Sequence, residues 1–175
     1  MKKTIFLFIS MLALYSMGFA QNGAFKKGDK LLNLGIGINS YYSGGIPFGA
    51  SLEFGVTDDI SVGGNVDYLS SKYGGILDYK FTAIYFGARV NYHFNRILKI
   101  ESDKVDVYGG LTLGYRSFSF KDNNGGIGLG KSYGSGVYVG GLVGGRYYFS
   151  NNIGAFVELG AIGSTNARVG LAFKF

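Results

Sequence analysis

The chain has 175 residues, of which 47% are apolar, 17% aromatic and only 16% charged, and it contains 31 glycines and no cysteine. This length accommodates one domain, and the high apolar content excludes an intrinsically disordered chain. The formal net charge of +6 comes without any dense Lys/Arg cluster, so the sequence predicts no nucleic-acid partner.

The first twenty residues have the layout of a secretory signal peptide. Two lysines and an apolar run over residues 5–15 precede the small residues Gly18 and Ala20, which occupy the −3 and −1 positions of a cleavage site. A membrane-anchoring helix needs about 20 consecutive apolar residues, which is more than this segment offers. We therefore expect residues 1–20 to be removed after export.

Beyond this segment, the recurring pattern is alternation of apolar residues with small or polar ones. Phe48, Leu52 and Phe54, for example, alternate with residues such as Ser51 and Glu53. This period of two is typical of β-strands with one apolar face, and helical spacing is not sustained anywhere. The eight segments predicted as strands span residues 30–40, 47–56, 60–70, 80–94, 104–117, 136–149, 152–162 and 166–175.

The predicted strands have the number, length and connections of a membrane-spanning barrel. Strands of about 9–11 residues cross the hydrocarbon layer when tilted near 45°. Two of the three connections after even-numbered strands are tight turns, whereas the longest connection, 118–135, follows an odd-numbered strand. The pattern predicts an all-β, eight-stranded antiparallel up-and-down transmembrane β-barrel over residues 30–175. Residues 21–29 form its periplasmic N-terminal segment, and both termini are periplasmic.

Composition indicates which face of this barrel points outward. Alternation alone fits either a wall that faces lipid or the apolar cavity of a soluble periplasmic lipid carrier. The non-apolar face lacks the many Lys and Glu residues of a water-exposed surface, so we expect it to fill the lumen, and we expect aromatic girdles at both rims. The girdle residues are Tyr92, Phe94, Tyr147, Phe149, Phe173 and Phe175 at the periplasmic rim, and Tyr41, Tyr42, Phe48, Tyr68, Phe81 and Tyr115 at the outer rim.

The charges on the polar face nearly balance, which predicts an ion-pair network inside the lumen. Buried charges are costly unless they are paired and hydrogen-bonded. We expect Glu53 and Glu158 to pair with Arg89, Arg146 and Arg168, because all five lie on polar faces. The alternative is a small porin-like channel for ions or small solutes, lined by these charges. Eight strands leave an interior that side chains can fill, which favours the closed lumen.

Two features suggest chemistry, but their context does not fit it. Residues 125–132 match the phosphate-loop pattern G-x-x-x-x-G-K-S, yet no buried strand precedes them and no helix follows. His93 is the only histidine, so a metal site would lack both cysteine and a second histidine. No Ser/His/acid group can be assembled at the outer rim. We therefore expect no enzymatic activity, no cofactor and no metal site.

The last strand carries the most specific motif. It ends in Val-Gly-Leu-Ala-Phe-Lys-Phe over residues 169–175. With the signal peptide and eight amphipathic strands, this ending resembles the small outer-membrane β-barrel family that includes the OmpA transmembrane domain and OmpX. The resemblance implies a monomer in outer-membrane lipid, with a role in envelope integrity, adhesion or defence. It also implies that Leu171, Phe173 and Phe175 form the signal for the outer-membrane assembly machinery.

The longest connection, 118–135, is the main candidate for recognition. It combines aromatic and basic residues with flexible glycines, a composition that suits contact with lipopolysaccharide phosphates, a host surface or a partner. The alternative is a passive solvated loop. The outer-loop candidates are Phe118, Phe120, Lys121, Lys131 and Tyr133.

Overall fold

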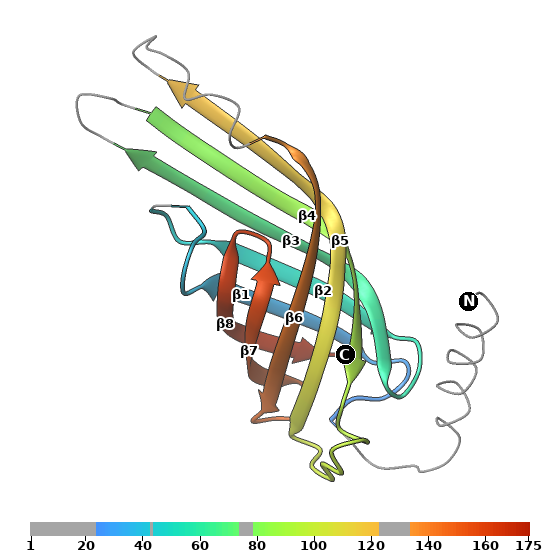
Figure 1. Ribbon diagram of the computed structural model, residues 1–175. Helices are drawn as coiled ribbons and strands as arrows, with labels where there is room; N and C mark the ends of the chain where they lie inside the picture. The colour runs from blue at the N-terminus through green and yellow to red at the C-terminus, as the bar shows by residue number, and fades with distance from the viewer. Residues whose placement is uncertain (1–23, 43, 74–78, 123–133) are drawn as a thin grey trace, which may run out of the picture.

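The computed structural model describes residues 24–42, 44–73, 79–122 and 134–175, which form one closed barrel of eight antiparallel strands. Each strand pairs with its neighbours in sequence, and β8 closes the barrel against β1 (Figure 1). The predicted up-and-down barrel is confirmed. Within the described ranges, no helix is long and apolar enough to cross a membrane. The strands are β1 (Lys30–Gly37), β2 (Phe48–Gly55), β3 (Ile60–Tyr73), β4 (Tyr79–His93), β5 (Val105–Asp122), β6 (Gly136–Tyr148), β7 (Ile153–Ile162) and β8 (Thr165–Lys174).

The observed strands follow the predicted ones closely, and β5 is the main exception. It continues to Asp122, because the alternation persists beyond residue 117 and β4 extends far enough to pair with it. Phe118, Phe120 and Lys121 therefore lie in a strand and not in a loop, which corrects the predicted boundary. The predicted signal peptide, the phosphate-loop pattern, Lys131 and Tyr133 lie outside the described residues.

The strands alternate between an exposed apolar wall and a buried polar interior. Phe54 and Val90 are 44% exposed, whereas Glu53 and Asn91, which adjoin them in sequence, are at most 1% exposed. This is the reverse of a soluble protein, in which the apolar residues form the core. The lumen is therefore packed with polar side chains, as the composition predicted.

The aromatic residues expected at the rims divide between the two faces. Tyr68 and Tyr115 lie on the outer wall, with exposures of 43% and 41%. Phe81 is only 5% exposed and packs inside the barrel, because it shares the inner face of β4 with Tyr85. Tyr42 also turns inward, and its hydroxyl lies 2.6 Å from that of Tyr85. Phe81 and Tyr42 are therefore corrections to the predicted outer girdle.

The two ends of the barrel differ. The turn end holds the C-terminus and the connections that follow β2, β4 and β6, whereas the loop end holds the connections after β1, β3, β5 and β7. At the loop end, β3, β4 and β5 extend beyond the other strands (Figure 1). β2 pairs with β3 only as far as Tyr68, and β6 pairs with β5 only as far as Arg116. The residues beyond these points, up to Asp122 on β5, form a three-stranded sheet that we call the loop-end sheet.

Candidate functional site

The lumen near the turn end contains a buried network of charges centred on Arg146. The Arg146 guanidinium of β6 donates hydrogen bonds to Asp106 of β5 at 2.8 Å and to Glu53 of β2 at 2.9 Å. It also donates to Asn33 at 3.1 Å and lies 3.9 Å from the centre of the Tyr108 ring. The side chains of Arg146, Asp106 and Glu53 are fully buried. Arg146 thus links its own strand, β6, to β1, β2 and β5.

Arg89 of β4 connects this group to Glu158 of β7. It donates a hydrogen bond to Glu158 at 2.8 Å, and its Nε lies 3.6 Å from Glu53. Gly63 of β3 stands between Glu53 and Arg89 in the register. Its missing side chain leaves the space across which Glu53 and Arg89 approach. We call Glu53, Arg89, Asp106, Arg146 and Glu158 the lumen network.

Arg168, which we expected to pair with Glu53 and Glu158, is directly opposite Glu158 in the β7–β8 register, but among the described residues its guanidinium forms no ion pair with either carboxylate. Its guanidinium pairs with Asp67 of β3, and the Ser164 hydroxyl donates to the same carboxylate. Gly49 leaves room for this arginine, since a β-carbon at Gly49 would lie 2.3 Å from the guanidinium carbon. The described lumen therefore holds two separate charge groups, one centred on Arg146 and one formed by Arg168 and Asp67.

His93, which the alternation of β4 places on the polar face, lies in the interior of the turn end. Its Nδ1 lies 2.7 Å from Asp106, and its Nε2 lies 3.1 Å from the Ser61 hydroxyl. Ser61 and Asp106 occupy the polar faces of the strands on either side of β4, so alternation combined with strand order could have placed them together. Alternation and strand order are readable from the sequence, but the height of each residue along the barrel axis is not.

This Ser–His–Asp arrangement resembles that of a nucleophilic triad, but its surroundings differ from those of a catalytic site. The Ser61 hydroxyl also donates to Glu53 at 2.9 Å. The Phe25 ring stacks on His93 with 3.5 Å between the ring centres, and Ser61, His93 and Asp106 are at most 1% exposed. The three residues are therefore closed to a substrate in this structure. Among the described residues, no group of three or more His, Cys, Asp or Glu residues could hold a metal ion.

Phe25 belongs to a short segment, Ala24–Asp29, that closes the turn end and that we call the N-terminal strap. Gly28 and Lys27 attach it to the β2 side of the barrel through hydrogen bonds to Gly55 and Asp58, at 2.9 and 3.0 Å. Lys174 fixes its other end through a 3.0 Å hydrogen bond to the Ala24 carbonyl. Burial raises the pKa of Asp29, and the hydrogen bond from the backbone of Lys26 partly opposes this. The strap therefore covers the lumen network from the turn end.

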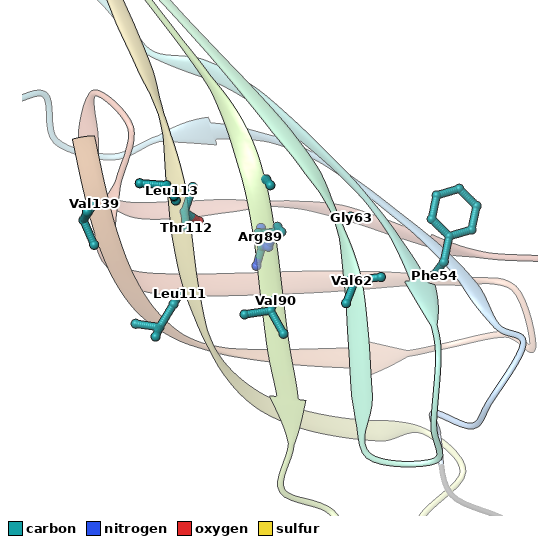
Figure 2. A pocket seen from close by; sticks show the side chains of 10 residues that line it. Phe54, Val62, Gly63, Arg89, Val90, Leu111, Thr112, Leu113 and Val139 are labelled. Carbon is teal, nitrogen blue, oxygen red and sulfur yellow. The ribbon is translucent and has the colours of Figure 1, made fainter. Parts of the chain in front are cut away.

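The outer wall has a shallow apolar hollow of about 670 Å³ over β2 to β6. Figure 2 shows Val62, Val90 and Leu111, which line it from three neighbouring strands. All three are at least 40% exposed, so the hollow lies on the outside of the barrel and not in the lumen. It forms where the small residues Gly64 and Ala88 are paired across β3 and β4.

The remaining predicted site residues lie at the barrel ends. Phe118 packs inside the loop-end sheet, with 5.8 Å between its ring centre and that of Phe81. In β8, Leu171 is 48% exposed and Phe173 is half-buried, whereas Phe175, just beyond the strand, is 68% exposed. The Phe175 backbone pairs with Lys30, where β1 begins. The C-terminal residues thus border the seam that closes the barrel.

No family description and no curated protein sequence matches the chain. Among solved structures, the outer membrane protein OprG from Pseudomonas aeruginosa matches with a TM-score of 0.55 and 14% identity, covering 88% of this chain and 98% of that chain. Ail, the attachment invasion locus protein of Yersinia pestis, matches with a TM-score of 0.52 and 13% identity, covering 85% and 99%. The chain has the fold of these small outer-membrane barrels.

Proposed function

We propose that the chain is an integral outer-membrane β-barrel, without catalytic activity, that is anchored by its apolar wall and displays a recognition surface at the loop end. The observation that carries the proposal is the inverted polarity of the barrel. Leu113 and Val139 on the outer wall are 60% and 73% exposed, whereas Arg146 and Glu158 inside are at most 2% exposed. An apolar surface of this extent suits lipid and not water.

The loop-end sheet is the part best suited to recognition. Leu69, Phe81 and Ala83 pack together on its inner face, with Tyr85 just below them, so apolar contacts support the strands beyond the barrel. Ail, which shares this fold, has attachment and invasion in its name. For the present chain we propose adhesion or partner recognition through this sheet and through the loop after β5, with Lys131 and Tyr133 as contributors.

The C-terminal strand is the segment through which we expect the barrel to be assembled into the membrane. Leu171, Phe173 and Phe175 alternate along one side of the chain end, next to the seam between β1 and β8. We propose that this side is read by the outer-membrane assembly machinery before the seam closes. The assembled barrel then functions as a monomer in outer-membrane lipid.

The location is tested by an arginine placed on the outer wall. We expect the unheated protein to migrate in a detergent gel as a compact species that shifts on boiling, and Leu113→Arg to destabilise it by about 2–4 kcal/mol in a bilayer. Ser119→Arg, on the same side of β5 but beyond Tyr115, is the matched control and should change stability by about 1 kcal/mol or less. A soluble protein without a heat shift, in which Leu113→Arg is neutral, would contradict the proposal and favour a periplasmic lipid carrier.

The second candidate function, a small channel, is tested by conductance. The lumen network and the strap cover the turn end, so we expect no steady single-channel current from the purified protein in a planar bilayer. Regular conductance steps that change in ion selectivity on Arg89→Gln would instead establish the porin-like alternative. The position of Arg89 between Glu53 and Glu158 makes it the residue that permeating ions would meet.

A further inference from the structure

Three lysines occupy one row across the loop-end sheet. Lys72 on β3 is paired with Lys80 on β4, and Lys80 is paired with Lys121 on β5. Lys72 is exposed and Lys80 is partly exposed, whereas Phe81, the residue after Lys80, is buried on the inner face. Because side chains alternate along a strand, Lys80 lies on the face that continues the outer wall.

The rows beneath the lysines change in polarity towards the loop end. Tyr68 and Ile84 are paired and exposed at 43% and 37%. The next row holds Ser70 and Thr82, whose hydroxyl oxygens lie 3.3 Å apart. The lysines follow. An apolar row, a hydroxyl row and a cationic row match the order of hydrocarbon, polar linkage and charged headgroup along a bilayer normal.

Lys72 and Lys80 occupy directly opposite positions on neighbouring strands. Like charges directly opposite each other on neighbouring strands repel. Within the described residues, no salt bridge joins Lys72 or Lys80 to a carboxylate. An anion from outside the chain would neutralise the repulsion.

We propose that Lys72 and Lys80 bind phosphate groups of lipid headgroups in the outer leaflet. The inference rests on the proposed function, because it requires the wall below the lysines to lie in hydrocarbon. Lys72 is four residues beyond Tyr68, about 13 Å along the strand. From this height the long lysine side chains can reach the headgroup layer, while Tyr68 remains at the inner edge of that layer. The lysines continue the apolar wall that includes Ile84. This favours a lipid over a soluble anion, because one lipid molecule would contact the wall with its acyl chains and the lysines with its phosphates.

The test compares one lipid with and without its phosphates. Purified protein in zwitterionic detergent is mixed with bisphosphorylated lipid A or with the same lipid after its phosphates have been removed, and the lipid retained by immobilised protein is measured. Heat-dependent gel mobility first establishes the barrel in each sample, so that failure of the barrel is distinguishable from failure to bind. We expect about 25-fold tighter binding of the phosphorylated lipid, given about fivefold for each of Lys72 and Lys80.

Charge-removing variants locate the site. Lys72→Gln combined with Lys80→Gln should weaken binding by about 25-fold. The matched control, Lys99→Gln combined with Lys104→Gln, removes two exposed lysines at the turn end and should bind as the unmodified protein does. Equal binding of the two lipids, or unchanged binding by the Lys72/Lys80 variant, would overturn the proposal. Displacement of the lipid by heparin at equal phosphate or sulfate concentration would also overturn it, because the row would then be a general polyanion surface.

Discussion

Replacing Arg146 with methionine is expected to lower the free energy of unfolding by about 3–5 kcal/mol, the range for breaking a buried ion pair by removing one partner. The substitution leaves the buried carboxylates of Asp106 and Glu53 without the guanidinium that bonds both of them. The measurement is the fraction of compact, fast-migrating protein as a function of denaturant concentration in detergent micelles.

Two controls separate the network from a general charge effect. Lys104→Met removes one positive charge from an exposed turn and should change stability by about 0.5 kcal/mol or less. Arg146→Met combined with Glu53→Met should be less destabilised than the sum of the single variants, because it also removes one of the carboxylates left behind. The same unfolding midpoint for Arg146→Met and Lys104→Met would mean that the network contributes nothing to stability.

Gly63→Ala is expected to cost about 3 kcal/mol, at the upper end of the usual range for overpacking. A β-carbon at Gly63 would lie 1.9 Å from the carbonyl oxygen of Leu52 and 2.8 Å from the Cα of Glu53. Both are backbone atoms of β2, so they can move away only if the β2–β3 pairing opens. The same movement would separate Glu53 from Arg89 across the lumen.

The residue after Gly63 supplies its matched control. A β-carbon at Gly64 would approach only the Gly87 carbonyl oxygen, at 3.3 Å. Because alanine is no worse than glycine within a strand, Gly64→Ala should stay within about 1 kcal/mol of the unmodified protein. Denaturant midpoints measured side by side test the difference, and equally stable Gly63→Ala and Gly64→Ala proteins would refute it.

The number of strands and the inward or outward direction of most side chains could be predicted from the period of two, and the strand order from the up-and-down connections between consecutive strands. The polar faces carrying Glu53, Arg89 and Arg146 could be identified in this way. Their partners could not all be identified, since the height of a residue in a barrel depends on the stagger between strands, and alternation does not encode this stagger. Arg168 lies on the expected face and directly opposite Glu158 in the register, but its guanidinium extends to Asp67, a direction that alternation does not encode either.

Two other features escaped prediction for local reasons. Phe81 is an aromatic residue near a rim, and this position suggested a girdle, although its place in the alternation of β4 directs it inward. The contact between Phe25 and His93 joins a segment without periodicity to the barrel interior, and no pattern in the sequence connects them. The strap that closes the turn end could therefore be seen only in three dimensions.

The lumen network also constrains how the barrel forms. Arg146 and Glu53 are separated by 93 positions in the chain, and such distant contacts form late and slowly during folding. Until β6 and β7 arrive, an inserted sheet carrying Glu53 and Arg89 would present charges to hydrocarbon without their full set of partners, which is costly. Partly inserted intermediates are thereby disfavoured, and we expect the final strands to enter the bilayer together with closure, in one cooperative step.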